Sequence, residues 1–417
     1  MEKGLNSAPH NDGAHIRTAA AVVGAGLVGG TLAVALARHG VDVVLIDRLA
    51  PSAMVAATFD GRASAVALSG MRFWRAVGLW DHVTGANEPI REIRVSDGDA
   101  PLFLHYDHAE LGDDPLGFMA ENRVLRAAIG AEIGRMKTPP RILAPADVAD
   151  MSQSIDDITL TLADGRTVTA ALVVSAEGRE AKLRTLAGIG VTGWTYPQVA
   201  IVATIGHVRP HDGIAHERFL PAGPFAILPL PDENGVHRSS LVWTERADAA
   251  AGYLALKEPQ FLAEIQDRVG GFLGDLTLIG PRFSHPLGLQ FASEYSRGRL
   301  VLAGDAAHGI HPIAGQGLNL GFRDAAALTE IIVDAKQLGL DLAHPEGLAR
   351  YQRWRRSDNL LMAGVTDVLN RVFSNDIAPV RQLRGAGLGI VNRIPPLKKL
   401  LMRHAMGTVG DLPVLMR

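Results

Sequence analysis

Cysteine is absent from this chain of 417 residues, which excludes disulfides, thiolate metal sites and cysteine nucleophiles. Aromatic residues make up only 5%, and the formal net charge of −3 gives no excess of positive charge for binding nucleic acid. The lack of cysteine fits a reducing compartment, and we expect a cytoplasmic location. The length and the 47% of hydrophobic residues predict a globular protein of about two domains.

One long run without charge, from Ala19 to Ala37, has the composition of a membrane span. Four glycines interrupt this run, which favours a strand, a tight turn and a helix over that alternative. We predict a strand over 19–23, a helix over 27–39 that ends at Gly40, and a second strand over 41–46. Residues 1–17 are polar and are predicted to form a disordered tail.

The glycines of this turn have the spacing of a dinucleotide-binding fingerprint. Gly24 suits a tight turn, Gly26 lets the backbone approach a pyrophosphate, and Gly29 allows the helix to pack closely on the strand. Asp47 ends the second strand, where a carboxylate meets the ribose of a bound dinucleotide. A glycine-rich turn in an ordinary α/β domain and a solvated Asp47 are the alternatives.

A second glycine segment lies far downstream and has the residue types that hold a flavin. Asp305 follows a buried strand predicted over 300–303 and can accept hydrogen bonds from polyol hydroxyls. A loop over 312–317 is expected to position a flat ring, next to which larger side chains would clash, and a helix then directs backbone N–H groups at that ring. Together the two segments predict FAD. The residues assigned to the flavin here are Asp305, Pro312, Gly315, Gly317, Leu318 and Asn319.

Two arginines are candidates for contacting the cofactor. Arg62, in the segment 60–69, can place its guanidinium against phosphates or near the flavin. Arg123 opens a helix predicted over 121–136, an unfavourable end for a cation that a bound anion would offset. Solvent-exposed arginines are the alternative in both cases. His308 and His311 have no third ligand nearby, so no metal site is predicted.

The remainder of the chain predicts a second sheet and a helical end. Strands are expected within 91–107 and repeatedly between 194 and 282, and an Asp-Gly turn predicts a hairpin of 158–163 with 167–174. Helical spacing of apolar residues predicts helices from 318 and after 345. We divide the chain into an α/β FAD-binding domain (18–90, 108–190 and 286–345), a sheet-based domain (91–107 and 191–285) and a C-terminal helical segment (346–417).

Three motifs in this order resemble those of single-component FAD-dependent aromatic hydroxylases. They are the fingerprint at 24–29, Asp-Gly-Arg with Ala-Leu-Ser over 60–69, and Gly-Asp at 304–305 followed by Gly-Gln-Gly-Leu-Asn at 315–319. Through Arg218-Phe219 and the segment 223–230, the chain is most similar to the ubiquinone-biosynthesis hydroxylases. The resemblance covers residues 19–356. It implies a glutathione-reductase-type, Rossmann-like FAD domain and a sheet-based substrate domain, without a dedicated NAD(P)H domain.

The resemblance also implies a reaction and a pocket. A reductant such as NAD(P)H reduces FAD, dioxygen forms a flavin 4a-hydroperoxide, and its distal oxygen passes to the ring of a polyprenylated phenol. The family's Asp-Gly near FAD and NAD(P)H is Glu177-Gly178 here, and the longer carboxylate is expected to re-aim its hydrogen bonds. No general base stands out, and His216 is the nearest candidate. The candidates for the ring pocket, which alternatively form sheet core, are Phe219, Phe225, Leu228, Pro229 and Trp243.

The end of the chain is basic, with seven Lys or Arg against one Asp between 377 and 417. Interleaved apolar residues favour a segment that binds the inner face of a membrane or a quinone-biosynthesis protein complex. A helix packed on the body with a solvated basic face is the alternative. Our leading hypothesis is an FAD-dependent monooxygenase of ubiquinone biosynthesis. The other two are a hydroxylase of a small aromatic acid, with Arg218 or Arg238 as its cation, and a non-catalytic FAD-bearing scaffold.

Overall fold

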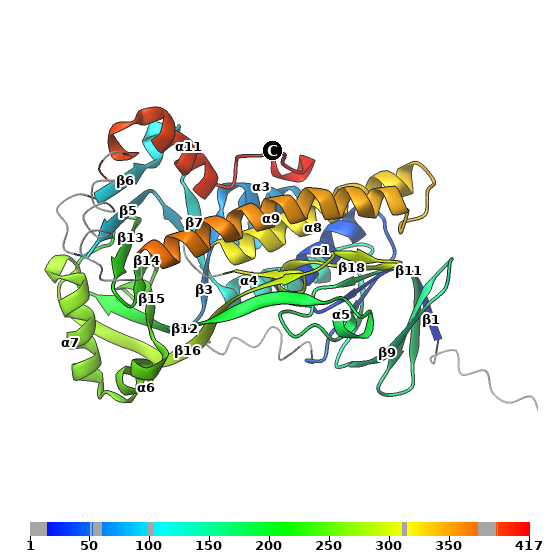
Figure 1. Ribbon diagram of the computed structural model, residues 1–417, viewed down its shortest axis with the longest axis horizontal. Coiled ribbons are helices and arrows are strands. Elements are labelled where there is room, and N and C mark those ends of the chain that lie inside the picture. The colour runs from blue at the N-terminus through cyan, green and yellow to red at the C-terminus, as the bar shows by residue number, and fades with distance from the viewer. Residues whose placement is uncertain are drawn as a thin grey trace, which may run out of the picture.

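The molecule contains two large sheets, and long helices run along it (Figure 1). The computed structural model describes residues 15–50, 52, 61–98, 103–310, 315–373, 389 and 391–417. This mixed architecture confirms the predicted α/β fold class. None of the helices in the described part of the chain has the length and apolar character that crossing a membrane requires. The uncharged run 19–37 is the predicted strand, turn and helix.

The first sheet carries the fingerprint turn. Its parallel strands lie in the order β18, β11, β1, β2, β8, and α1 (Leu27–Arg38) connects β1 to β2. The strand bounds are β1 His15–Val23, β2 Val43–Ile46, β8 Arg141–Leu143, β11 Thr167–Ser175 and β18 Leu300–Leu302. β1 starts at His15 instead of Ala19, so residues 15–17 belong to the sheet and not to a tail, while 1–14 lie outside the described residues. Every residue of β2 is buried, as expected for a parallel sheet that is covered on both faces.

An antiparallel extension completes this sheet. The predicted hairpin is present, because β10 (Ile158–Leu162) pairs antiparallel with β11 and Gly165 adopts a φ of +87° in the turn between them. β9 (Val148–Gln153) pairs with β10, and β17 (Ser296–Arg297) with β18. The strands that bear the two glycine segments, β1 and β18, both neighbour β11.

The second sheet contains the strands predicted within 91–107 and 194–282. Their order is β19, β16, β12, β15, β14, β13, β5, β6. The bounds are β5 Glu92–Asp97, β6 Phe103–Asp107, β12 Val191–His207, β13 Ile214–Leu220, β14 Gly223–Glu233, β15 Val236–Arg246, β16 Leu276–Ala292 and β19 His308–Gly309. Helices α6 (Ala247–Ala255) and α7 (Glu258–Val269) cover one face, and their buried Ala250, Phe261 and Ile265 pack there.

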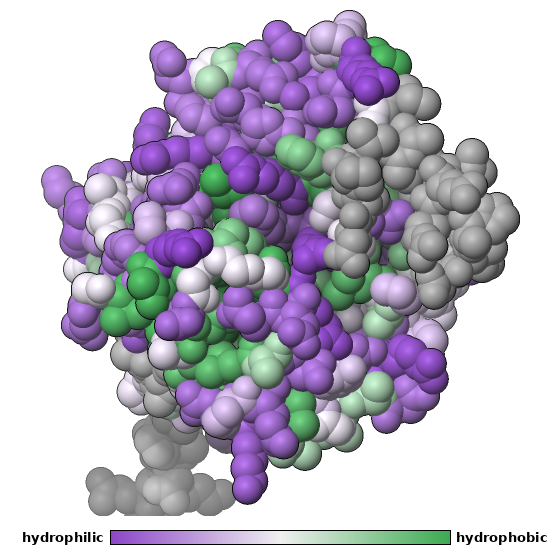
Figure 2. All heavy atoms as spheres, turned by 90° about the vertical axis from the view of Figure 1, so that its left-hand side faces the viewer, coloured by the Kyte–Doolittle hydropathy of each residue, from purple (hydrophilic) through white to green (hydrophobic). Residues whose placement is uncertain are grey.

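The end of the molecule that carries α7 shows patches of apolar side chains between polar ones (Figure 2). Phe103 and Phe272 are among the exposed aromatic side chains. Both line a small cavity of about 400 Å³, which is also bordered by Phe225 of β14 and Val269 of α7. A third, smaller sheet has β3 (Ala63–Ala67) and β4 (Glu88–Ile90) on either side of β7 (Gly117–Glu121). Helices α3 (Leu68–Ala76) and α4 (Asn122–Arg135) follow β3 and β7.

Two long helices run along the molecule (Figure 1), α8 (Gln316–Gln337) and α9 (Pro345–Phe373). α8 packs on α1 so closely that a Cβ at Gly321 would lie 2.5 Å from Val28. α11 (Pro395–Ala405) follows near the end of the chain and packs on the body through the fully buried Met402. Lys398 of this helix contacts Glu110 at 2.5 Å. The described part of the predicted basic tail therefore contains a packed helix.

Candidate functional site

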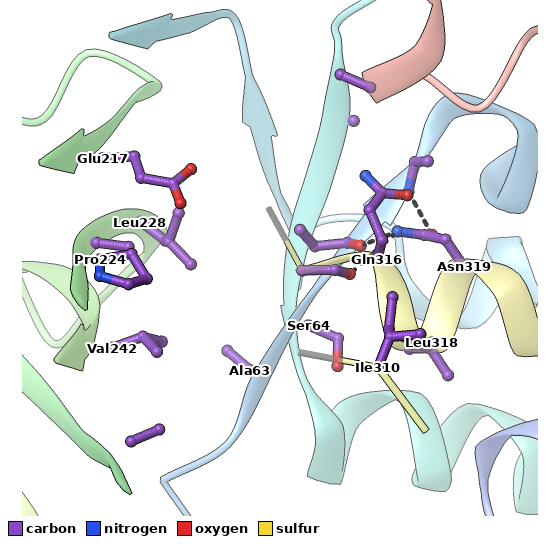
Figure 3. A pocket seen from close by; sticks show the side chains of 18 of the residues that line it. Ala63, Ser64, Glu217, Pro224, Leu228, Val242, Ile310, Gln316, Leu318 and Asn319 are labelled. Carbon is purple, nitrogen blue, oxygen red and sulfur yellow. Dashed lines mark hydrogen bonds between the residues drawn. The ribbon is translucent and has the colours of Figure 1, made fainter. Parts of the chain in front are cut away.

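A single large cavity brings the two glycine segments together. Its volume is about 1450 Å³, and residues 26–28 of the first segment and 315–319 of the second both line it. The second sheet forms the facing wall, and Figure 3 shows Pro224, Leu228 and Val242 of that sheet across the gap from Gln316 and Leu318. Two sequence motifs almost three hundred residues apart therefore face one space, as the prediction of a shared ligand requires.

The three fingerprint glycines have separate steric reasons. A Cβ at Gly24 would lie 2.4 Å from the carbonyl oxygen of Ala176, and a Cβ at Gly29 would lie 1.9 Å from that of Gly24. A Cβ at Gly26 would meet no atom within 4 Å, because this residue faces the cavity at the start of α1. Tight packing thus requires two glycines, whereas Gly26 leaves the helix N-terminus open to an anionic ligand.

Asp47 holds this turn through a hydrogen bond to its backbone. Its carboxylate accepts hydrogen bonds from the backbone N–H of Ala25 at 2.6 Å and of Leu49 at 2.7 Å. Asp47 is not part of the cavity lining, so its predicted contact with a ribose stays a prediction. The observed bonds give it a structural task at the same turn.

The second glycine segment is fixed by the side chain of Asn319. Its Oδ1 accepts a hydrogen bond from Ala67 N at 2.9 Å, and its Nδ2 donates to Ala65 O at 2.9 Å. Gly315 precedes α8 with a φ of +61°, a left-handed conformation that favours glycine. Gly315, Gly317, Leu318 and Asn319 all line the cavity, while Pro312 lies outside the described residues. Asn319 thus ties α8 to β3 at the floor of the site (Figure 3).

A buried ionic cluster anchors the loop that carries Asp305. The fully buried carboxylate of Asp324 accepts hydrogen bonds from Gly304 N at 3.0 Å, from His308 Nε2 at 2.5 Å and from Arg355 Nε at 2.8 Å. Burial alone would raise the pKa of Asp324, but His308 and Arg355 lower it to about 2. The sequence reasoning missed this cluster, since its members lie on three separate elements.

Charged side chains gather at the glycine side of the cavity. Arg62, Arg126, Arg179 and Asp305 line it, and Arg179 Nε lies 3.9 Å from Asp305 Oδ2. The buried Arg184 donates hydrogen bonds to Ala306 O at 2.8 Å and to Arg179 O at 2.6 Å, which links the loops that carry both groups. Arginines beside a helix N-terminus suit a ligand with phosphates.

Arg126 and Arg179 were not among the predicted cofactor-binding residues, although they lie three residues after Arg123 and two residues after Glu177. Arg123 is not in the lining; it donates to Glu121 at 2.7 Å and pairs with Glu233 at 3.5 Å, so carboxylates offset the helix dipole where a bound anion was expected. Arg126 follows one helical turn later and does line the cavity.

Glu177 caps a helix instead of facing the cavity. Its carboxylate accepts hydrogen bonds from Ser175 Oγ at 2.7 Å and from Leu183 N at 3.1 Å, at the start of α5 (Lys182–Leu186). The neighbours Ala176, Gly178 and Arg179 line the cavity, but Glu177 does not. These bonds hold the Glu177 carboxylate against backbone amides at the start of α5, and the predicted effect of its extra methylene stays a prediction.

The second sheet offers alternate residues to the cavity, and this corrects the predicted pocket. Phe219 and Leu228 line the cavity, but Phe225 and Trp243 point to the opposite face, where they pack under α6 and α7. Pro229 is buried outside the lining and shares the strand parity of Phe225. Both faces of these strands are apolar, so the sequence could not indicate which face bounds the ligand.

His216 is a weak candidate for a general base. It borders both cavities, and its ring lies 4.4 Å from that of Phe272. Burial, with the nearby Arg94, lowers the pKa of His216 to about 4, so the ring is neutral near pH 7. Among the described residues, no group of His, Cys, Asp and Glu could hold a metal ion, and His311 lies outside them.

Comparison with known proteins defines the class. A family model described as an FAD binding domain matches residues 17–358, and the chain belongs to this family. It is 53% identical over 399 residues to the ubiquinone hydroxylase UbiL of Rhodospirillum rubrum, covering 95% of this chain and 92% of that protein. It is 34% identical to the 3-demethoxyubiquinol 3-hydroxylase of Escherichia coli, covering 94% and 98%.

The fold is shared with a solved aromatic hydroxylase. p-Nitrophenol 4-monooxygenase PnpA of Pseudomonas putida superposes with a TM-score of 0.79 at 20% identity, covering 95% of this chain and 100% of that one. These findings confirm the predicted family, the FAD cofactor and the class of FAD-dependent monooxygenase. The open approach at Gly26 and the arginines that line the same cavity suit the phosphates of FAD.

Proposed function

We propose that this protein hydroxylates the aromatic ring of a polyprenylated phenol in ubiquinone biosynthesis, with dioxygen and NAD(P)H or another reductant as cosubstrates. The observation that carries the proposal is the shared cavity, which has cofactor-binding glycine turns on one side and an apolar sheet face on the other. Similarity to ubiquinone hydroxylases along nearly the whole chain supports the same substrate class.

The residues of the cavity divide the work between cofactor and substrate. We assign the pyrophosphate of FAD to Gly26 and the start of α1, its ribitol to Asp305, and its ring to residues 315–319. Bound FAD supplies the redox chemistry, and the protein orients the partners and excludes water. The apolar residues that face the ring across the cavity are Phe219, Pro224, Ala226, Leu228 and Val242.

A small aromatic acid fits this wall less well. Arg238 is buried against Glu233 at 2.7 Å and does not line the cavity, and Arg218 donates to Gly98 O at 3.1 Å on the other face of the sheet. Among the lining residues described on the second sheet there is no Arg or Lys, whereas Glu217 is an acid. A substrate carboxylate would therefore meet repulsion at this wall.

A deletion strain tests the assignment. We expect the strain to accumulate a polyprenylated phenol that lacks one ring hydroxyl and to regain ubiquinone when the gene is restored, as measured by mass spectrometry. A normal quinone profile would contradict the proposal. The scaffold alternative predicts restoration by a variant that binds FAD but shows no substrate-dependent oxidation of NAD(P)H, whereas the enzyme predicts no restoration.

We further propose that the protein docks on a membrane surface through α9 and α11. Leu361, Val365, Val368 and Val372 form an exposed stripe along α9, and Val365 and Val372 also line the cavity. α11 exposes Leu400 and other apolar residues beside basic Lys399 and Arg403. An apolar stripe that continues into the cavity suits a substrate that enters from lipid, and the basic residues suit anionic headgroups.

Flotation with vesicles of mixed anionic and zwitterionic phospholipid tests this docking. The double variant Leu361→Asp and Val368→Asp is expected to bind vesicles at least about tenfold more weakly, because it removes two apolar side chains from the bilayer contact. Leu338→Asp, which changes an exposed leucine beyond the end of α8, is the matched control. Equal binding of both variants would contradict the membrane-facing assignment of α9.

A further inference from the structure

A carboxylate, Glu217, interrupts the mostly apolar wall that the second sheet presents to the cavity. The register of the second sheet places Glu217 of β13 between Val95 of β5 and Ala226 of β14. The same row continues through Val242 and, at its other end, Leu104, and all of these residues line the cavity. Glu217 is half-buried and lines the open cavity, so its carboxylate is accessible to a ligand there.

The carboxylate points into the cavity, toward the start of α8. Figure 3 shows Glu217 on the sheet side, with its oxygens directed into the gap that separates it from Gln316 and Leu318. Burial raises the pKa of Tyr106, which lines the same wall, and the negative charge of Glu217 raises it further, to about 12. Thr244, two residues along β15 from Val242, also lines the cavity, and its buried hydroxyl has no hydrogen-bond partner among the described residues.

We propose that the Glu217 carboxylate accepts the hydroxyl hydrogen of the substrate's phenol, thereby orienting the ring and selecting a neutral phenol over an aromatic acid. This inference rests on the proposed function and names the side chain that recognises the hydroxyl group of the substrate. A carboxylate has two acceptor oxygens, so it can bind a phenol in addition to neighbours in the protein.

The chemistry is that of a hydrogen bond without proton transfer. The ordinary pKa of a glutamate lies about six units below that of a phenol, so the phenol keeps its proton and the carboxylate keeps its charge. A charge-assisted hydrogen bond is short and directional, which fixes the rotation of the ring about its long axis. The carboxylate of an aromatic acid would meet this charge as a repulsion.

Two variants test this role against ligands that differ by one group. The probes are a geranyl-substituted phenol, its O-methyl ether and the matching hydroxybenzoate, titrated into the FAD-loaded protein while the flavin absorbance is followed. Glu217→Leu is expected to weaken the phenol at least about tenfold and to leave the ether within about twofold. Glu217→Gln keeps the side-chain shape, removes the charge, and is expected to bind the benzoate more tightly than the wild type.

Controls separate this inference from the proposed function. Glu258→Gln, on the exposed start of α7, is expected to bind every probe with the affinity of the wild type. Glu217→Asp keeps the charge on a shorter side chain and is expected to keep part of the preference for the phenol that Glu217→Leu loses. Equal weakening of phenol and ether in Glu217→Leu, or no change in either, would overturn the role of Glu217 even while the wild type hydroxylates the phenol. A wild type that neither binds nor hydroxylates the phenol would overturn the proposed function and this inference together.

Discussion

The buried cluster around Asp324 makes a quantitative prediction for Asp324→Asn. The substitution keeps the shape of the side chain but removes the charge that faces Arg355, a residue with no exposed surface. Breaking a buried ion pair costs about 3–5 kcal/mol. Arg355 retains Asp358 at 2.7 Å and Asn359 at 3.0 Å, so we expect the lower end of this range.

The pKa of Asp324 gives an independent magnitude. The pKa lies near 2 in the folded protein against an ordinary value of 3.8 for aspartate. Each pKa unit corresponds to about 1.4 kcal/mol, which gives roughly 2.4 kcal/mol. Because the folded pKa is lowered, this stability is present above the unfolded pKa and is lost as the pH falls toward 2. Both arguments give a loss of about 2–3 kcal/mol at pH 7 for Asp324→Asn.

Urea unfolding of the FAD-loaded protein, followed by circular dichroism, measures this loss. Asp334→Asn is the matched control on the same helix, because Asp334 is half exposed and its contact with Arg350 is 3.7 Å long. An exposed pair of this kind contributes less than about 1 kcal/mol. If the free energies of unfolding of Asp324→Asn and Asp334→Asn differ by less than about 0.5 kcal/mol, the buried cluster does not stabilise the fold as argued.

Three further predictions follow from the cavity. Gly29→Ala is expected to give insoluble or flavin-free protein, because its Cβ meets Gly24 O. Gly26→Ala should unfold like the wild type in urea but bind FAD more weakly in a fluorescence titration. If both variants behave in the same way, the steric assignment of these glycines is contradicted. Asp305→Ala is expected to lose at least about tenfold in FAD affinity, and a fully yellow, active variant would refute its ribitol role. Burial lowers the pKa of His216 to about 4, so below pH 6.5 this imidazole takes up a proton in the unfolded chain but not in the folded one. The contribution of His216 to the free energy of unfolding should therefore fall by about 3 kcal/mol between pH 6.5 and 4. This loss should be absent in His216→Gln.

Local patterns predicted the cofactor side of the protein well. The strand, turn and helix around Gly24 were readable because the glycine spacing and the apolar runs are contiguous in the sequence, and the same holds for the hairpin at Gly165. The helix after Gly315 was readable from its apolar spacing. Each of these signals lies within one element or one turn.

The substrate side depended on information that spans several elements. Phe225 and Leu228 lie on one strand with apolar neighbours on both faces, and only the packing of α6 and α7 decides that Phe225 faces the core. Glu217 gave no signal because a charged residue in a strand ordinarily faces solvent. Arg126 was passed over for Arg123 because the rotation of α4 against the cavity is set by tertiary packing.

The most direct test of the central claim is a crystal structure of the protein with FAD bound. We predict one FAD molecule in the large cavity, with its pyrophosphate at Gly26 and its ring against residues 315–319. Density for FAD that contacts only one of the two glycine segments, or that lies outside this cavity, would contradict the account.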